Sequence, residues 1–142
     1  MERPPHTARE LTKDECERFL REQPYGRLGL CARGEPYVVP VSFVYEPGAV
    51  HFHSAKSGRK IDFINENNRV CFQVDKWQNG WASVICYGTV TLRDDLETIK
   101  KVFGLFMGMD WPEERLKRAS VYIGTIDIEE MTGRCGDGFE PS

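Results

Sequence analysis

The chain has 142 residues, 40% of them hydrophobic, and a formal net charge of -3 at pH 7. This length suits one ordinary domain with its own core and is short for two. No apolar run approaches the roughly 18 residues that span a bilayer, and the weakly acidic balance gives no reason to expect a nucleic-acid partner. Because MERPPHTARE lacks the apolar segment of a secretory signal, we expect a cytoplasmic protein without membrane or nucleic-acid partners.

The five cysteines are an odd number with no CxxC pair, which fits neither a disulfide framework nor a zinc ribbon. We therefore expect reduced thiols. Cys31, Cys71 and Cys86 lie within apolar runs and are expected in the core. Cys135, in the glycine-rich segment GRCGDG, is the one cysteine with a case for exposure and reactivity, although a structural role is favoured there too.

The first predicted helix follows a polar, proline-containing arm. Thr12 and Glu15 have the spacing of a capping box, which predicts a short helix from about residue 13 to residue 22. Pro24 would end it. The buried side of this helix would carry Cys16, Phe19 and Leu20.

Two β-type runs, YGRLGLCA and PYVVPVSFVYE, come next and are joined by Arg33, Gly34 and Glu35, which predicts a hairpin. In the second run the two-residue period divides the side chains between two faces. The face expected in the core carries Tyr37, Val39, Val41, Phe43 and Tyr45. The opposite face carries Val38, Pro40, Ser42 and Val44.

The segment AVHFHS is predicted as a third strand. Its period places Val50 and Phe52 on one face and His51 and His53 on the other. A one-residue error in register would exchange these faces, so the sequence does not decide which histidine faces a site. A short helix is expected after Gly58.

The second half of the chain is predicted as two strands, RVCFQVDKW and WASVICYGTVTLRD, then helical segments and a last strand, SVYIGTIDIEEM. The second of these strands alternates in the manner of a half-buried antiparallel sheet. From Leu96 the period becomes helical, and Trp111 with Pro112 opens another helical turn. Six or so strands with tight turns and short helices predict a mainly β fold, a small antiparallel barrel with flanking helices.

The stretch HFHSAKSGRK, which begins at His51, gathers many hydrogen-bond donors in ten residues. Its structural interpretation is a strand end, a turn and a solvated helix start. A zinc site at His51 and His53 is disfavoured, since zinc takes three or four ligands and His6 is the one other histidine. A phosphate fits better, because N–H groups at a helix N-terminus, hydroxyls and a guanidinium hold a dianion. Such donors would come from Ser54, Ser57, Gly58, Arg59 and Lys60.

Four segments carry a resemblance to a known family: PYVVPVSFVYE, HFHSAKSGRKIDFI, SVICYGTVTL and IEEMTGR. In order and spacing they resemble the nitroimidazole-resistance (Nim-type) flavoproteins of the pyridoxamine 5′-phosphate oxidase-like superfamily, over roughly residues 9–134. The resemblance implies an antiparallel six-stranded split barrel at 12–134, between an N-terminal arm at 1–11 and a C-terminal tail at 135–142. It also implies flavin mononucleotide (FMN) in a cleft between two subunits, and hence a homodimer.

The resemblance also implies the cofactor contacts. The strand expected along the isoalloxazine ring comprises Val38, Val39, Pro40, Val41, Ser42 and Phe43. Pro40 cannot donate a ladder hydrogen bond, which is consistent with a strand left partly open to a ligand. The phosphate and ring-edge contacts would come from His53, Ser54, Arg59, Lys60 and Ser83. His53 is the one candidate catalytic group, as a proton donor beside the cofactor.

The sequence departs from its relatives in two places. Pyridoxamine phosphate oxidases carry basic and aromatic substrate-binding residues near the C-terminus, whereas this chain has MTGRCGDGFEPS, so that oxidase activity is not expected. A short loop over 75–81 brings Trp77 and Trp81 close together, where either could stack on a flavin or substrate, or serve the core or an interface.

The resulting functional hypothesis is an FMN-dependent reductase. It would pass electrons from a reduced nicotinamide or another donor to a small organic acceptor such as a nitroaromatic. The alternatives are a flavin carrier or redox sensor without turnover, a haem protein with His51 or His53 as axial ligand, and a deazaflavin protein. The basic pair Arg59 and Lys60 favours flavin over haem.

Overall fold

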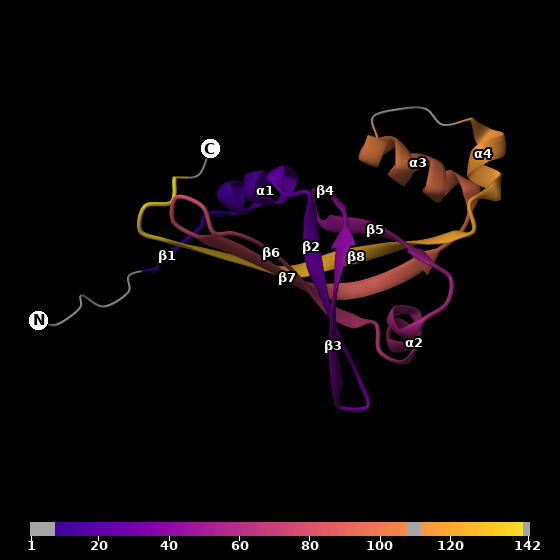
Figure 1. Cartoon of the computed structure of the whole chain (residues 1–142), viewed down its shortest axis with the longest axis horizontal. Helices are drawn as coiled ribbons and strands as arrows, with labels where there is room; N and C mark the ends of the chain where they lie inside the picture. The colour runs from indigo at the N-terminus through magenta and orange to yellow at the C-terminus, as the bar shows by residue number, and fades with distance from the viewer. Residues whose placement is uncertain (1–7, 108–111, 141–142) are drawn as a thin grey trace, which may run out of the picture.

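The structure is a computed structural model that describes residues 8–107 and 112–140. The strands are β1 (Ala8–Glu10), β2 (Tyr25–Ala32), β3 (Glu35–Ser42), β4 (Val44–Glu46), β5 (Ala49–Ala55), β6 (Arg69–Lys76), β7 (Ala82–Arg93) and β8 (Val121–Gly136). The helices are α1 (Lys13–Glu22), α2 (Arg59–Glu66), α3 (Leu96–Met107) and α4 (Glu113–Arg118). Every strand pair is antiparallel, in the order β3-β2-β6-β7-β8-β5-β4, with β1 added along β8 (Figure 1).

The predicted mainly β fold is confirmed as an open antiparallel sheet with flanking helices, consistent with a split barrel. Strands β3 and β4 end the order, so the sheet does not close on itself. The six long strands match the predicted number, and the three-residue strands β1 and β4 are additional. β4 arises because the chain leaves β2 at Ser42 and pairs with β5 from Val44, which faces His51.

The predicted β2–β3 hairpin is confirmed. Ala32 faces Glu35, which leaves Arg33 and Gly34 as a two-residue turn with φ values of 53° and 75°. Positive φ at both central residues matches the right-handed twist of paired strands. The hairpin projects away from the rest of the sheet (Figure 1).

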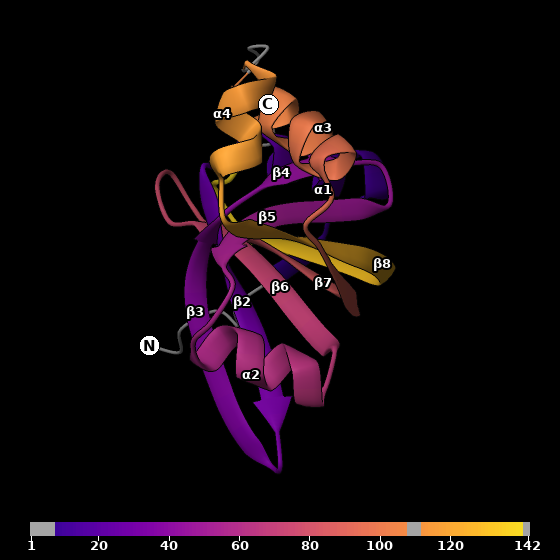
Figure 2. The ribbon, with the colours of Figure 1, turned by 90° about the vertical axis from the view of Figure 1, so that its right-hand side faces the viewer.

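Two hydrophobic clusters hold the fold together. The main core lies inside the curved sheet and contains Leu28, Phe52 and Phe72, which have no exposed surface. The second lies outside the sheet, where α3 and α4 cover the start of β8 (Figure 2). Its buried members are Ile99, Val102, Leu116 and Ile123. The predicted alternation is confirmed, with Val50 and Phe52 in the main core and the two histidines on the outer face.

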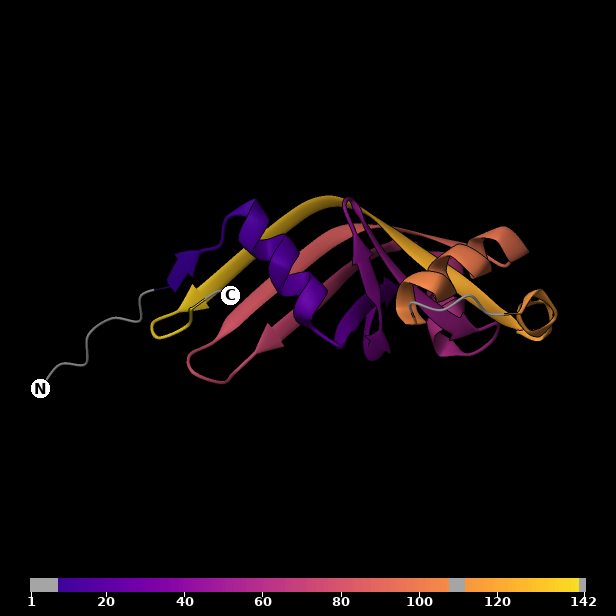
Figure 3. The same ribbon diagram turned by 90° about the horizontal axis from the view of Figure 1, so that it is seen from above.

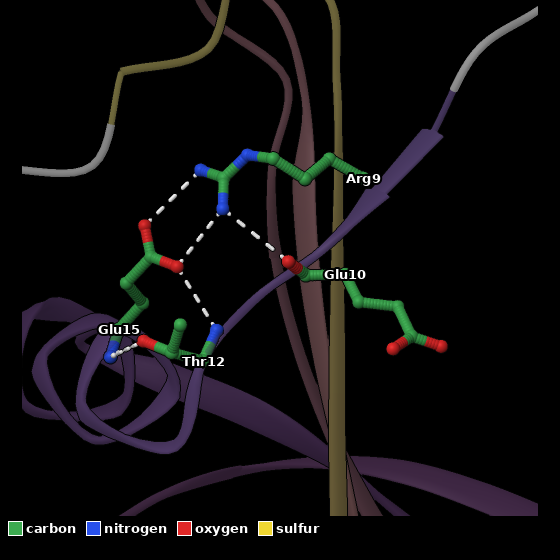
Figure 4. A network of polar contacts seen from close by, with 4 residues as sticks. All are labelled: Arg9, Glu10, Thr12 and Glu15. Atoms are coloured by element: carbon green, nitrogen blue, oxygen red, sulfur yellow. Dashed lines mark hydrogen bonds and ion pairs between the residues drawn. The ribbon is translucent and has the colours of Figure 1, made fainter.

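Helix α1 begins at the predicted capping box. The Glu15 N–H donates to Thr12 Oγ1 at 3.2 Å, and the Thr12 N–H donates to Glu15 Oε1 at 2.9 Å. Arg9, on β1, donates to both carboxylate oxygens of Glu15 and to the carbonyl of Glu10 (Figure 4). Residues 8–10 of the predicted arm therefore form a strand that is bound to α1.

The remaining helices follow the predicted order. Helix α2 begins directly after Gly58, and the helical period from Leu96 is α3. The three helices α1, α3 and α4 lie along the arched sheet, with α1 towards one end and the other two towards the opposite end (Figure 3). Trp111, expected in the second helical turn, lies outside the described residues, and α4 begins at Glu113. Within the described ranges, no helix is long and apolar enough to cross a membrane.

The structural role favoured for Cys135 agrees with its 2% exposure, because the glycine-rich segment continues β8 to Gly136 and pairs with β1 and β7. One cysteine prediction is wrong. Cys31, expected in the core, is exposed on the outer face of β2. Cys86 is buried as predicted, and Cys71 is half-buried.

Candidate functional site

The N-terminal turn of α2 is an open end suited to an anion. Its N-cap is Gly58, at a φ of 116° that side-chain-bearing residues rarely adopt, and no side chain caps the helix there. The first N–H groups of a helix have no partner within the helix, and its dipole is positive at this end. This end of α2 can therefore hold a phosphate through its backbone.

Arg59 and Lys60 add two cations to this end of the helix. The Arg59 guanidinium lies 5.8 Å from the ring centroid of Tyr37, and the Lys60 ammonium lies 6.0 Å from that of Phe52. Within the described part of the chain, neither cation forms an ion pair. Burial lowers the pKa of Lys60, so an anionic partner would stabilise its charged form.

Ser54 stands at the end of β5 beside this helix. It is 5% exposed, and its hydroxyl donates to the carbonyl oxygen of Ala55 at 2.8 Å. A serine hydroxyl has a single proton, so Ser54 can donate to a phosphate only after its hydroxyl rotates. Ser57, in the following loop, is exposed.

The two histidines of β5 have different environments. His51 is 4% exposed, and its Nδ1 and Nε2 each lie 2.9 Å from an oxygen, Thr125 Oγ1 and Glu46 Oε1. The bond to His51 lowers the pKa of Glu46, whose carboxylate also accepts from Lys101 at 3.2 Å. Because both of its ring nitrogens are engaged, His51 has none left for a ligand.

His53 packs its ring against α3, although the residue remains exposed. Its ring centroid lies 5.9 Å from that of Phe103 and 5.4 Å from that of Phe106, both in edge-on contact. Burial lowers the pKa of His53, and the positive charge of Lys60 lowers it further. His53 is therefore mainly neutral at pH 7, with one ring nitrogen able to donate and the other able to accept.

The strand predicted along the ring, β3, is an edge strand. Val38 is 64% exposed, and Pro40 and Ser42 are exposed with it on the outer face. An edge strand presents unpaired N–H and C=O groups to a ligand. The alternate residues, which turn toward the core and can reach such a ligand only through the backbone, are Val39, Val41 and Phe43.

Ser83 lies apart from α2, on the outer face of β7. The Gln73 amide donates to Ser83 Oγ at 3.4 Å, and Arg27 donates to Gln73 and to Asp75 at 3.1 and 2.5 Å. Arg27 also faces Pro40 of β3 in the strand register. The sequence reasoning missed Arg27 and Gln73, although both stand at polar positions of otherwise apolar, alternating strands.

The predicted contacts thus form two groups within one chain. His53, Ser54, Arg59 and Lys60 belong to the segment where β5 ends and α2 begins, and Lys60 is near enough to His53 for its charge to lower the pKa of the imidazole. Ser83 is three strands away from β3, which is about 14 Å at the usual strand spacing. A polar strip across β2 and β6 lies between these two strands.

The fold is an open antiparallel barrel in which the basic N-terminus of α2 lies beside the edge strand β3. These features are those of a ligand-binding split barrel. The family described as pyridoxamine 5′-phosphate oxidase matches residues 12–135. The chain belongs to this family.

Three known proteins are similar to this chain. The 5a,11a-dehydrotetracycline/5a,11a-dehydrooxytetracycline reductase of Streptomyces rimosus is 42% identical over 76 residues, 50% of this chain and 49% of that protein. An FAD-binding protein from Mesorhizobium loti has a TM-score of 0.77 at 27% identity, over 94% of this chain and 99% of that one. A protein proposed to confer 5-nitroimidazole antibiotic resistance in Bacteroides thetaiotaomicron has a TM-score of 0.81 at 22% identity, over 93% and 89%, and supports the fold alone.

Proposed function

We propose that the protein is an FMN-binding reductase of small organic acceptors such as nitroaromatics, including 5-nitroimidazoles, and that it works as a homodimer. The observation that carries the proposal is the uncapped N-terminus of α2 with Arg59 and Lys60, next to the edge strand β3. Membership of the family, the FAD-binding protein and the reductase among its relatives support a flavin and a reduction.

The residues present fit a flavin mononucleotide. A guanidinium can bind two phosphate oxygens at once, so Arg59 and the α2 N–H groups would hold the phosphate, with Lys60 as a further charge. The open edge of β3 offers donors and acceptors to a flat polar ring. When bound, the flavin supplies the redox chemistry, while the protein supplies binding, orientation and tuning.

His53 is the proposed proton-transfer group. It is largely neutral at pH 7 because burial and the positive charge of Lys60 lower its pKa, and its ring contacts Phe103 and Phe106 edge-on. A neutral imidazole can donate a proton to a reduced acceptor and take one back from solvent. It is the one group of the predicted site with this capacity near pH 7.

The homodimer would form through the outer face of β2, β3, β6 and β7. Val38 and Tyr87, which are 64% and 40% exposed, line an open groove of about 700 Å³ on this face. Tyr25, at the start of β2 and outside the lining of this groove, is 51% exposed. Contiguous exposed apolar surface of this kind is typical of an interface. A second copy here would allow Ser83, which is remote from α2 in its own chain, to contact the cofactor held by the other.

The test is the amount of flavin bound to the purified double variant Arg59→Ala/Lys60→Ala, compared with the wild type. The wild type should show paired near-ultraviolet and blue absorption bands and release FMN on denaturation, whereas the double variant should purify without it. The matched control is Arg21→Ala/Lys117→Ala, which removes the same charge from residues paired with Glu17 and Glu114. Full flavin occupancy in Arg59→Ala/Lys60→Ala would show that the phosphate assignment is wrong.

The same preparation separates the alternatives. A Soret band would move the function to haem, with His53 as the axial ligand, because both nitrogens of His51 are engaged. Chromatography of the released cofactor distinguishes FMN from a deazaflavin. A protein that holds flavin but shows no turnover with reduced nicotinamides and a nitroimidazole would be a carrier or sensor.

A further inference from the structure

The loop between β6 and β7 presents an indole to solvent. Trp77 is 72% exposed, the largest fraction among the exposed large hydrophobic side chains of the described residues. Its ring is stacked on that of Trp81, with centroids 5.8 Å apart and planes 22° apart. Because Trp77 stays so exposed while one face rests on Trp81, its other face is open.

This pair of indoles is held in place from both sides. Trp81 lies so close to the backbone of Gly136 that a Cβ there would be 2.1 Å from the indole Nε1, and the Gly136 N–H donates to the Trp81 carbonyl at 2.9 Å. Trp77 Nε1 donates to Asp75 Oδ2 at 2.7 Å. A ring fixed before binding loses little conformational entropy when a ligand stacks on it.

The pair also adjoins the predicted ring site. Asp75 accepts from Trp77 on one oxygen and from Arg27 on the other. Arg27 faces Pro40 of β3, and Asp75 faces Ser83 of β7, so each partner of this ion pair stands next to a predicted ring contact. Asp75 and Arg27 therefore connect Trp77 to both predicted ring contacts, Ser83 on β7 and Pro40 on β3.

We propose that Trp77 is a substrate-binding residue, a stacking platform for the planar, electron-poor ring of the acceptor, with Trp81 as its fixed base. The face of an indole is electron-rich and attracts an electron-poor ring in an offset stack. Arg27 and Asp75 neutralise each other, so the platform suits an uncharged ring better than an anion. The identity of the acceptor rests on the proposed function, whereas the stacking itself needs no redox step.

Equilibrium dialysis of metronidazole, a 5-nitroimidazole, against the oxidised full-length protein tests the proposal. Trp77→Ala should raise the dissociation constant about tenfold, the usual size of a lost aromatic stack. Trp77→Phe keeps a ring and should stay within about threefold of the wild type. Gln78→Ala, in the same loop, is the control for a disturbed loop and should bind as the wild type does.

Wild-type affinity in Trp77→Ala would overturn the proposal, and so would a wild type that binds no metronidazole. Loss of the dimer in Trp77→Ala, read by size-exclusion chromatography, would make the indole a subunit contact instead. Flavin content of the same samples is a separate readout. If the wild type holds no flavin and Trp77→Ala still weakens dialysis binding, the proposed function fails while this inference stands.

Discussion

Phe52 of β5 and Gly124 of β8 face each other in the sheet, and the phenyl ring occupies the space that a side chain at 124 would need. A Cβ on Gly124 would lie 2.2 Å from Phe52 Cζ. The same ring lies 6.0 Å from the Lys60 ammonium, so this contact in the core also supports the predicted phosphate site. Packing in the barrel and the position of the site are therefore coupled through Phe52.

Gly124→Ala should destabilise the protein by about 1–3 kcal/mol, the usual cost of overpacking a filled core. Gly104, inside α3, has open space where a Cβ would stand, with no neighbouring atom within 4 Å, so Gly104→Ala should stabilise by about 0.5–1 kcal/mol. Urea unfolding of both variants measures the two free energies. Equal midpoints for the two would contradict the close approach of Phe52 to β8.

The site could be predicted from the sequence where it depends on local pattern. The two-residue period placed Val50 and Phe52 in the core, and the Gly58 break with its following cations marked the start of α2. The same period put His51 and His53 on one face but could not separate them. Their difference comes from β4, β8 and α3, which supply Glu46, Thr125 and Phe106 from distant parts of the chain.

Glycine was the main source of error near the C-terminus. We expected GRCGDG in a C-terminal tail, yet Gly133 and Gly136 lie in β8, where other side chains occupy the space that a Cβ would need. A Cβ on Gly133 would meet the sulfur of Cys16 at 2.5 Å, and one on Gly136 would meet Trp81 at 2.1 Å. Glycine that permits close packing and glycine that forms a turn cannot be told apart by local sequence alone.

The Arg9–Glu15 pair predicts a specific acid dependence. The hydrogen bonds from Arg9, with those from Thr12, lower the pKa of Glu15 from 4.5 to about 2. A carboxyl with a lowered folded-state pKa stabilises the fold above its ordinary pKa and loses that effect as the pH falls toward the folded value. Glu15→Gln should therefore unfold more readily than the wild type at neutral pH, with the difference shrinking between about pH 4.5 and pH 2.

Thermal unfolding followed by circular dichroism across this pH range measures the difference. The control is Glu17→Gln, on the same helix, where Glu17 pairs with Arg21 at 3.8 Å and caps nothing. A gap between wild type and Glu15→Gln that stays constant down to pH 2 would mean that Glu15 does not titrate as part of this network.

Thiol labelling tests the proposed dimer face. Cys31 is the one exposed cysteine of the five, whereas burial raises the pKa of Cys86 to about 12 and makes it inert. A fast phase of labelling should therefore come from Cys31 and disappear in Cys31→Ser. Because Cys31 lines the groove of the proposed interface, this phase should slow as rising protein concentration forms dimers.

Cys135→Ser is the control, since Cys135 is 2% exposed and should not contribute to the fast phase. Parallel size-exclusion runs give the dimer fraction at each concentration. A Cys31 rate that stays the same while the dimer fraction rises would place the interface on another face of the molecule.

His53 provides the last test, because its two perturbing groups can be separated. Burial is the larger cause of its lowered pKa and Lys60 the smaller, so Lys60→Met should raise the pKa of His53 while leaving it below the ordinary value of 6.5. Because the pKa of His53 is lower in the folded protein than in the unfolded chain, the unfolded chain binds the imidazole proton more tightly. The free energy of unfolding therefore falls as the pH drops from about 6.5 toward the folded-state pKa. NMR titration of the ring C–H proton, assigned with His53→Gln, measures the pKa directly. Lys56→Met removes an equal charge bound to Asp94 and should leave the pKa unchanged; an equal rise in both variants would refute the local effect of Lys60.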